Sequence, residues 1–595
     1  MVSRLGYIIR LFVILLAVFV LQKVLFMIVN VSLAAGAPLG QCLLALWHGL
    51  RLDIVTACYL VVLPILITLV SCVVRNLPMR AILRPYHIIL SLCITVIFLS
   101  DTVLYMFWGA KLDANDLMYT THPKDMLASL SWWSVIIILL LVVGITWLFA
   151  LLLIKATPKR FSDHPQLWAV SLFLPLMGLN FLGMRGSVSE STANPSYAYF
   201  SHYAFCNHAA LNPTFNMMHS LFKTQDLENE FVFMDEWRVN EVLADAFSAH
   251  SDHSDTLFTS SRPNFLVIIW ESGGSAMVMN DSVAPNLWAL KDEGVYFSNC
   301  YANNFRTDRG LVSILNGWQG LPTTSLMKRS DVCRRLPSLP HALRDVGYTS
   351  AFTYGGDIGF TNMKLYMSET GFDTVRGGDA FPKAAVQSAW GVPDHILLSP
   401  SLVNMSRPFL SLALTLSSHE PWEVPMRRLA DKRQNAFAYT DSCIGAMVSA
   451  LRTSPLWDSL VVIILPDHGV VAPGVSSIAS PRAAKMPIVM VGGAVKQSCT
   501  FDMLMSQSDL VATLLVQLGI DITPFSFSRN VLSAHYPSQH QFAMHAYKNG
   551  LNMITPTDTL QYDCVNRRPS AKADTSLTVF TEALLQRIYQ STARL

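Results

Sequence analysis

Charged residues are scarce in this chain, and its cysteines form no recognisable motif. Only 14% of the 595 residues are charged and the net charge is +2, whereas ordinary soluble domains carry roughly 25% charged residues. No Lys/Arg-rich tract, zinc-finger spacing or RNA-binding signature is present, so nucleic acid is excluded as an expected partner. The ten cysteines include no Cys-x-x-Cys pair, and a chain of this length does not need disulfides to fold. We expect most of the cysteines to be free and buried.

Apolar sequence is abundant instead, at 52% of the chain, and it is concentrated in the first third. Five stretches there approach the ~20 residues that cross a bilayer core. They are residues 11–29, 54–74, 86–107, 132–154 and 167–182. The sequence therefore predicts a transmembrane domain of five spans over residues 1–185.

Basic residues gather in two loops between these stretches, and such residues mark the cytoplasmic side of a membrane. An odd number of spans then places everything after residue 185 on the extracytoplasmic side. A cleavable signal peptide at the first stretch would not change this orientation, because the second span would still begin outside. The two groups are Arg75, Arg80 and Arg84 after the second stretch, and Lys155, Lys159 and Arg160 after the fourth.

The rest of the chain divides into three predicted parts. Residues 186–262 form an extracytoplasmic linker with helices near 209–224 and 235–248, and residues 551–595 form a C-terminal extension. Between them, residues 263–550 alternate apolar strand patterns with helical patterns. This alternation predicts an α/β domain with a mostly parallel central sheet between layers of helices.

Three short apolar runs of this domain are followed closely by acidic or imidazole side chains. Glu271 follows the first run, His419 the second, and Asp467 and His468 the third. The carboxyl ends of parallel strands meet at one edge of a sheet, where ligands bind. An isolated Asp-His pair is usually an ordinary loop feature. The repeated placement favours an active site and hence an enzyme.

Two carboxylates and one imidazole are suitable ligands for a divalent metal ion. Glu271, Asp467 and His468 would suit zinc or manganese if the strand ends converge. Such an ion neutralises the oxygens of a phosphoryl group, whose attack requires a nearby oxygen nucleophile. A hydroxyl that also coordinates the ion has a lowered pKa and becomes reactive. Thr307 is the candidate for this nucleophile.

Thr307 precedes a helical pattern at residues 308–316, and the N-terminus of a helix favours a phosphate group. Arg306 and Arg309 flank Thr307 and are candidates to pair with phosphate oxygens, although Arg309 fits a surface ion pair equally well. Thr307 also fits the role of a helix N-cap, which is compatible with catalysis. On sequence alone His419 fits a substrate contact and a structural histidine equally well.

Five motifs in this domain resemble those of the sulfatase-like membrane phosphotransferases, whose best-known members are the lipoteichoic acid synthases. The resemblance implies an alkaline-phosphatase-like domain that follows five spans in the bacterial cytoplasmic membrane. It also implies one divalent ion, commonly manganese, with zinc and magnesium as alternatives. The motifs are Trp-Glu-Ser-Gly at 270–273, Arg-Thr-Asp-Arg-Gly at 306–310, Ser-Ser-His-Glu-Pro at 417–421, Ala-Tyr-Thr-Asp at 438–441 and Pro-Asp-His-Gly at 466–469.

The same resemblance assigns roles to particular residues. It implies that Glu271, Thr307, Asp467 and His468 bind the metal ion, and that His419 contacts the substrate. Thr307 would carry a phospho-head-group as a covalent intermediate. The donor would be a membrane phospholipid, phosphatidylglycerol or phosphatidylethanolamine, and the acceptor a glycan or glycolipid.

One departure from the family pattern leaves the transferred group open. Lipoteichoic acid synthases place a tryptophan and an arginine around an asparagine where this chain has Thr361, Asn362 and Met363. Phosphoethanolamine is therefore an alternative cargo to phosphoglycerol. A phosphodiesterase or phosphatase with the same site is a second alternative, and a non-catalytic membrane binding protein is a third. A true sulfatase is excluded, because Thr307-Asp308-Arg309 lacks the Cys/Ser-x-Pro-x-Arg pattern.

Overall fold

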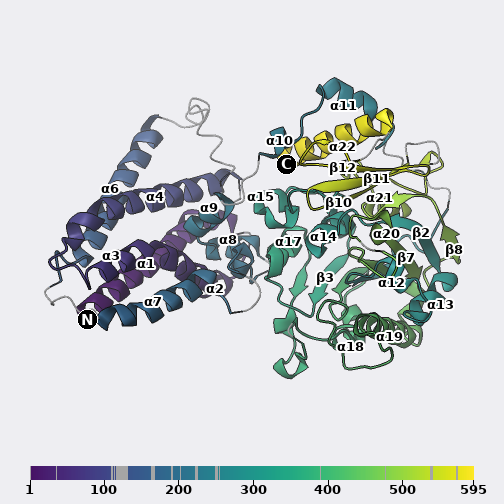
Figure 1. Ribbon diagram of the computed structural model, residues 1–595, viewed down its shortest axis with the longest axis horizontal. Coiled ribbons are helices and arrows are strands. Elements are labelled where there is room, and N and C mark those ends of the chain that lie inside the picture. Colours follow the sequence, from purple (N-terminus) through teal and green to yellow (C-terminus); the bar gives the residue numbers. More distant parts are fainter. Residues whose placement is uncertain are drawn as a thin grey trace. The chain divides into compact units, whose positions relative to one another are not determined.

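The chain folds into two units, Met1–Gln225 and Asp226–Leu595. Figure 1 shows the first unit as a group of helices in purple and blue, and the second as an α/β unit in teal, green and yellow. The structure is a computed structural model, and it describes most of the chain. The described residues are 2–34, 36–108, 111–112, 114, 132–161, 168–188, 192–201, 203–221, 226–247, 252, 255–388, 390–475, 477–536, 541–570 and 574–595.

Among the described residues of the first unit, four helices are long and apolar enough to cross a membrane, namely Ser3–Val29, Leu39–Val70, Met79–Met106 and Ile136–Ala156. They overlap the first four predicted spans and support a membrane protein. The fifth predicted span overlaps a shorter helix that contains Pro175, and its first residue, 167, lies outside the described residues. The fifth span therefore stays a prediction. In this region α2 (Leu39–Leu60) and α3 (Val62–Val70) together form one span, and the other helices are α1 (Val2–Val29), α4 (Met79–Trp108), α6 (Trp132–Ala156) and α7 (Trp168–Arg185).

The second membrane helix begins at Leu39, before its predicted start at residue 54. The prediction started too late because charged residues interrupt the apolar pattern just before residue 54. Asp53 is fully buried in α2, where its Oδ2 accepts a 2.5 Å bond from the Lys23 ammonium of α1 and its Oδ1 accepts a 2.8 Å bond from the Asn212 amide. Lys111 pairs in the same way with buried Asp101. Charges inside a membrane domain are costly unless paired, and here each carboxylate has its own ammonium.

The predicted linker helix at 209–224 is two helices, α8 (Ala204–Ala210) and α9 (Pro213–Leu221). The helix is interrupted between Ala210 and Pro213 because Asn212 caps α9. The Asn212 side-chain oxygen accepts a hydrogen bond from the Phe215 N–H at 3.0 Å, and Pro213 occupies the first helical position, which does not need an N–H donor. The second predicted linker helix is present as α11 (Glu236–Val242), and residues 222–225 and 248 lie outside the described residues.

A nine-stranded sheet forms the core of the second unit, with the order β4-β3-β5-β1-β6-β7-β2-β8 and β9 paired to β2. Every ladder is parallel except those of β7, which runs antiparallel to β6 and to β2. This confirms the predicted mostly parallel sheet. The strands are β1 (Asn264–Trp270), β2 (Val295–Tyr301), β3 (Thr349–Tyr354), β4 (Thr374–Arg376), β5 (Phe409–Leu414), β6 (Leu460–Pro466), β7 (Lys485–Val491), β8 (Cys499–Phe501) and β9 (Met505–Ser506).

Helices pack against this sheet, and β1, β5 and β6 are buried along their whole length. A strand with no exposed residue must be covered on both faces. The helices α13 and α19 cover one face of the sheet, and their apolar side chains share a core with alternate residues of β1 and β6. The helices around the sheet are α12 (Ser275–Val278), α13 (Pro285–Glu293), α14 (Thr307–Asn316), α15 (Ser330–Cys333), α16 (Leu339–Arg344), α17 (Met363–Glu369), α18 (Asp394–Leu397), α19 (Lys432–Arg452), α20 (Pro481–Ala484) and α21 (Asp509–Gln517).

The helical patterns at residues 436–452 and 503–518 of the sequence predict two helices, whose bounds in the structure differ for identifiable reasons. The predicted helix at 436–452 begins at Lys432, because the Asp431 side chain accepts a 2.8 Å bond from the Gln434 N–H and caps the helix there. The predicted helix at 503–518 begins only at Asp509, because Met505 and Ser506 pair with β2 as an edge strand. Seven of the ten cysteines are buried, and all ten are free thiols, as expected.

A second, antiparallel sheet completes this unit and was not predicted. Figure 1 shows α22 lying along it, with α10 and α11 beside α22. The Gln586 side chain of α22 bonds the backbone of Phe233 and Met234, so residues 226–247 belong to this unit. The elements are β10 (Ala543–Tyr547), β11 (Gly550–Ile554), β12 (Thr559–Asp563), β13 (Arg568–Pro569), α10 (Leu227–Glu230) and α22 (Thr575–Arg594).

Candidate metal and phosphoryl-transfer site

The sheet register places two of the predicted site residues side by side. Trp270, the last residue of β1, pairs with Pro466, the last residue of β6. Because the two strands are parallel and end at the same level, Glu271 and Asp467 leave the sheet as neighbours. On the other side of β1, Ile269 pairs with Leu414 of β5, so the chain that leads to His419 begins at the same edge.

Hydrogen bonds fix the two carboxylates. The Glu271 N–H donates to the hydroxyl of Thr415 at 3.0 Å, and its Oε1 accepts from the Ser272 hydroxyl at 2.7 Å. Asp467 Oδ1 accepts two backbone N–H bonds, from Ser272 and His468, both at 2.8 Å. Ser272 has a positive φ of 60°, and this unusual conformation lets its backbone reach Asp467 while its side chain reaches Glu271.

One hydrogen bond determines which nitrogen of His468 faces the carboxylates. The ring Nδ1 lies 2.8 Å from the carbonyl oxygen of Gly469, and a carbonyl only accepts, so Nδ1 carries the hydrogen. Nε2 therefore offers its lone pair when the ring is neutral. It lies 3.6 Å from Glu271 Oε1 and 3.4 Å from Asp467 Oδ2. A backbone acceptor on the second ring nitrogen is the usual support of a metal-binding histidine.

Thr307 is the first residue of α14, and its hydroxyl donates to Glu271 Oε2 at 3.2 Å. The N-cap position belongs to Arg306, whose side chain makes no capping bond, so the alternative in which Thr307 is the N-cap is wrong. The helix reaches the strand ends because its fourth residue is glycine. A Cβ on Gly310 would lie 2.0 Å from the carbonyl oxygen of Asp467, well inside van der Waals contact.

Burial and mutual repulsion perturb the ionisation of this cluster. Burial, followed by the negative charge of Glu271, raises the pKa of Asp467 from 3.8 to about 7, while the Thr307 hydroxyl that faces the carboxylate opposes the shift. Burial disfavours the charged form of His468, but the two carboxylates outweigh this effect and raise the pKa of its imidazole. Both shifts reflect the concentrated negative charge of the two carboxylates, which a bound cation would neutralise.

The geometry fits a single divalent ion. One ligand atom from each of Glu271, Asp467 and His468 lies within 4.8 Å of the others, and no second such group occurs among the residues that the structure describes. Asp467 Oδ2 is buried and has no well-formed hydrogen bond. Two ligands of a tetrahedral ion at about 2.1 Å lie roughly 3.4 Å apart. The separations of Nε2 from the carboxylate oxygens, 3.4 and 3.6 Å, match this value and are too long for hydrogen bonds.

The two flanking arginines are oriented differently from one another. The Arg306 side chain is 55% exposed and its Nε lies 4.0 Å from Asp308 Oδ1. Arg309 points toward the chain after α14, where its Nη1 donates to the Pro322 carbonyl at 3.4 Å, and burial lowers the pKa of its guanidinium. Asp308, the residue after Thr307, has a closer cationic partner than Arg306. This partner is Lys328, whose Nζ lies 3.2 Å from Asp308 Oδ2 and which the sequence did not single out.

His419 adjoins the site through its preceding residue. The Ser418 hydroxyl donates to the carbonyl oxygen of Glu271 at 2.7 Å. His419 Nδ1 lies 2.8 Å from the carbonyl oxygen of Glu420, and its ring packs against Trp390 with centroids 4.2 Å apart. Ser418 lies within the Ser-Ser-His-Glu-Pro motif, but its bond to Glu271 depends on strand register, and Trp390 carried no sequence signal because it lies in a loop with no pattern of its own.

The segment that departs from the family pattern has an unusual backbone. Thr361 and Asn362 both have positive φ angles, 51° and 70°, immediately before α17. The Asn362 amide donates to the Met327 carbonyl at 3.0 Å, which ties this turn to the chain that follows α14. Asp357 accepts a 2.8 Å bond from the Gly359 N–H and serves as a turn residue.

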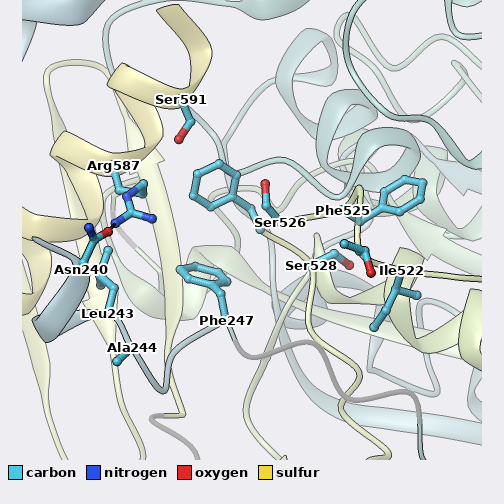
Figure 2. A pocket seen from close by; sticks show the side chains of 12 residues that line it. Asn240, Leu243, Ala244, Phe247, Ile522, Phe525, Ser526, Ser528, Arg587 and Ser591 are labelled. Atoms are coloured by element: carbon cyan, nitrogen blue, oxygen red, sulfur yellow. Dashed lines mark hydrogen bonds between the residues drawn. The ribbon is translucent and has the colours of Figure 1, made fainter. Parts of the chain in front are cut away.

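A separate cavity of about 390 Å³ lies between α11, α22 and residues 522–528. Figure 2 shows the Arg587 and Phe247 side chains at its wall. It contains none of the predicted site residues. Its Ser528 packs against Gly317, which directly follows α14, so this cavity lies at the opposite end of the helix from Thr307.

Part of the second unit is similar to known proteins. Residues 263–520 match the Sulfatase family model. Phosphoglycerol transferase I from Xanthomonas euvesicatoria pv. vesicatoria (strain 85-10) is 25% identical over 280 residues, which is 42% of this chain and 40% of that protein. The protein of the same name from Escherichia coli (strain 55989 / EAEC) is 22% identical over 251 residues, or 37% of this chain and 33% of that protein. The chain thus spans well under half the length of these relatives.

Two solved structures share the fold of this part of the chain. One is a protein in the alkaline phosphatase superfamily from Vibrio parahaemolyticus, with a TM-score of 0.52 and 23% identity. The other is the lipoteichoic acid synthase LtaP from Listeria monocytogenes, with a TM-score of 0.50 and 16% identity. Each comparison covers 61% of this chain and 98% of the other. Residues 263–520 are thus similar in sequence to the Sulfatase family, and the two structures show that this part of the chain has the fold of these proteins.

Proposed function

We propose that this protein is a membrane-anchored phosphotransferase that moves a phosphoglycerol group from a phospholipid to a glycan or glycolipid through a covalent intermediate on Thr307. The observation that carries the proposal is the position of the Thr307 hydroxyl. It lies at the N-terminus of α14, 3.2 Å from Glu271 and facing Asp467, in the same cluster as His468. A hydroxyl that is hydrogen-bonded to one buried carboxylate and faces a second is placed as a nucleophile rather than as a structural group.

Glu271, Asp467, His468 and Thr307 are the residues that would hold a divalent ion, for which we propose manganese, with zinc or magnesium as alternatives. When bound, such an ion would neutralise phosphoryl oxygens and lower the pKa of the threonine hydroxyl. The pairing of two acids with a neutral imidazole suits this assignment, because the acids supply the negative charge and His468 supplies a directed lone pair.

In the first step the Thr307 oxygen forms a bond to the phosphorus of the phospholipid, and the bond from phosphorus to the diacylglycerol oxygen breaks. Diacylglycerol leaves with a proton, and the threonine holds a phosphodiester. The resting hydrogen bond from Thr307 to Glu271 Oε2 orients the hydroxyl for this attack. The first N–H groups of α14 have no acceptor within the helix and face the incoming negative charge.

In the second step a hydroxyl of the acceptor forms the new bond to phosphorus, and the bond to the Thr307 oxygen breaks. Thr307 regains its proton and the site returns to its starting state. His419 lies at the edge of the same site and would contact the transferred group. Arg306 is exposed at the N-cap of α14 and is the better placed of the two predicted arginines to meet a phosphate oxygen, since Arg309 bonds Pro322.

The membrane unit supports a lipid donor, because it confines the enzyme and the phospholipid to one surface. We propose that α7 is a fifth span, which places residues 226–595 on the extracytoplasmic side of the bacterial cytoplasmic membrane. The basic groups after the second and fourth predicted spans favour this orientation. Phosphoglycerol is the preferred cargo because the matched relatives are phosphoglycerol transferases.

The proposal is tested with the purified full-length chain, manganese and phosphatidylglycerol labelled in its head-group. We expect label on the peptide that contains Thr307, detected by mass spectrometry after rapid quenching, and no label in Thr307→Ala. Thr453→Ala serves as a matched control, because Thr453 is an exposed threonine at the end of α19. Label in the Thr307→Ala protein, or none in the wild type, would contradict the proposed intermediate.

The same reaction separates the alternative activities. Transfer of label to a glycan acceptor supports the transferase, whereas release of free glycerol phosphate without acceptor labelling indicates a phosphodiesterase. Phosphatidylethanolamine labelled in its head-group replaces phosphatidylglycerol in a parallel reaction. A faster reaction with that donor would change the cargo and leave the mechanism in place.

A further inference from the structure

Two aromatic side chains of this unit share one carbonyl oxygen. The Trp390 indole N–H donates to the carbonyl oxygen of Glu420 at 2.5 Å, and His419 Nδ1 lies 2.8 Å from the same oxygen. The two rings are packed with centroids 4.2 Å apart and an interplanar angle of 55°. A carbonyl oxygen has two lone pairs and can accept both bonds at once.

This arrangement determines the hydrogen position of His419. Because the Glu420 carbonyl can only accept, His419 Nδ1 must carry a hydrogen. In the neutral ring the remaining nitrogen, Nε2, then holds an unshared lone pair. His468 has the same arrangement, because its Nδ1 donates to the Gly469 carbonyl. Each histidine therefore offers Nε2 as an acceptor, held by the carbonyl of the following residue.

Trp390 restrains this arrangement from a distant part of the chain. Its ring is held by Phe360, whose centroid lies 5.9 Å away at 78°, and its carbonyl packs closely against Gly356, where a Cβ would be 2.8 Å from it. These contacts fix the position of the indole independently of His419. Without Trp390, the imidazole would lose one packed face, and the Glu420 carbonyl would lose a second donor that holds its direction.

We propose that Trp390 is a positioning residue, which holds His419 so that Nε2 accepts a hydrogen bond from a hydroxyl of the glycerol phosphate cargo. The inference rests on the proposed function for the identity of that cargo. Part of the head-group recognition is thereby assigned to Trp390. This tryptophan lies outside the segment 361–363, which is the segment that departs from the family pattern. The recognised chemistry is a phosphate ester that carries a free hydroxyl.

The test compares two ligands that differ only in the glycerol part. Glycerol phosphate and inorganic phosphate are titrated calorimetrically into the full-length, manganese-loaded protein in detergent. We expect His419→Ala and Trp390→Ala each to weaken glycerol phosphate binding by about tenfold and to leave phosphate binding unchanged, and we expect the double variant to be no weaker than His419→Ala alone. Trp390→Phe keeps an aromatic face but removes the N–H donor, and we expect a loss of roughly threefold.

Several outcomes overturn the inference. Equal losses for phosphate and glycerol phosphate would assign Trp390 a structural role, and so would a Trp390→Ala effect that persists in full in the His419→Ala background. Unchanged binding in Trp390→Ala would also refute it. Trp288→Ala, which removes a tryptophan that is 40% exposed on α13, controls for loss of a surface indole.

Transfer assays distinguish this inference from the proposed function. In the wild type, glycerol phosphate binding that depends on His419 and Trp390 without any head-group transfer would refute the transferase while leaving the inference intact. Transfer that is insensitive to Trp390→Ala and Trp390→Phe would refute the inference while leaving the transferase intact. Where transfer occurs, we expect the two Trp390 variants to lower kcat/KM in the same order as their binding losses.

Discussion

Gly310 of α14 lies directly against the carbonyl oxygen of Asp467, and a Cβ at this position would approach that oxygen to 2.0 Å. The absence of a side chain lets the helix N-terminus carry Thr307 into the metal cluster. In an open helix a glycine-to-alanine change stabilises by roughly 0.5–1 kcal/mol. Here it must instead displace α14 from the strand ends.

We therefore expect Gly310→Ala to reduce head-group transfer at least about a hundredfold, since a shift of roughly 1 Å in a reacting group has that effect. Transfer rate and manganese affinity are the measurements. Gly144→Ala in α6 is the matched control, because nothing lies within 4 Å of a Cβ there. Normal transfer by Gly310→Ala would show that the approach of Thr307 to Asp467 is not required.

Metal content gives a second prediction that does not depend on turnover. The wild-type protein is expected to retain about one divalent ion per chain after purification, since one ligand cluster is present among the described residues. Asp467→Asn keeps the oxygen that accepts from Ser272 and His468 but replaces the charge. We expect this variant to bind no stoichiometric ion by elemental analysis, while Asp281→Asn, a change at an exposed loop position, binds as the wild type does. Full occupancy in Asp467→Asn would exclude Asp467 as a ligand.

The ionisation of the cluster predicts how metal binding depends on pH. The pKa of Asp467 is raised to about 7, so in the metal-free protein the carboxyl is protonated below that pH and ionised above it. A proton must leave before the ion binds, which makes the proton a competitor at low pH. The pKa of His468 is raised as well, so its proton also competes, and we expect manganese affinity to fall by at least about tenfold for each pH unit below about pH 7. Titrations between pH 5 and 8 measure this, and a flat profile would contradict it.

Much of the site could be predicted because it depends on strand ends. Glu271, Asp467 and His468 follow buried apolar runs, and parallel strands bring such ends together regardless of side-chain detail. The capping alternative for Thr307 was wrong because helix bounds shift by a residue or two without a sequence signal, and Arg306 takes that position. Trp390 was missed for a different reason. Its partner is a carbonyl oxygen 30 residues away, and backbone acceptors leave no trace in the sequence.

The fold was predictable to a similar extent and failed where local pattern was weak. The strands β1, β3, β5 and β6 follow apolar runs of the expected length. The smaller sheet was not predicted because β11 is buried throughout and β12 alternates, so the two strands of one hairpin show different patterns. The start of the second membrane helix was misplaced because Asp53 looks like an end of the apolar run, although its ion pair with Lys23 makes it part of the interior.

That ion pair gives the last prediction. Lys23 and Asp53 are almost fully buried, at 1% and 0% side-chain exposure, and their 2.5 Å bond joins α1 to α2. Removal of one partner leaves an uncompensated buried charge, which costs about 3–5 kcal/mol, whereas replacement of both by apolar residues of similar volume is often nearly neutral. We expect Lys23→Met to lower the thermal midpoint of the detergent-solubilised protein clearly, and Lys23→Met combined with Asp53→Leu to recover most of the loss. Equal destabilisation by the single and double variants would mean that the pair is needed for more than charge balance, and the Asn212 amide, which also bonds Asp53, would be the first group to examine.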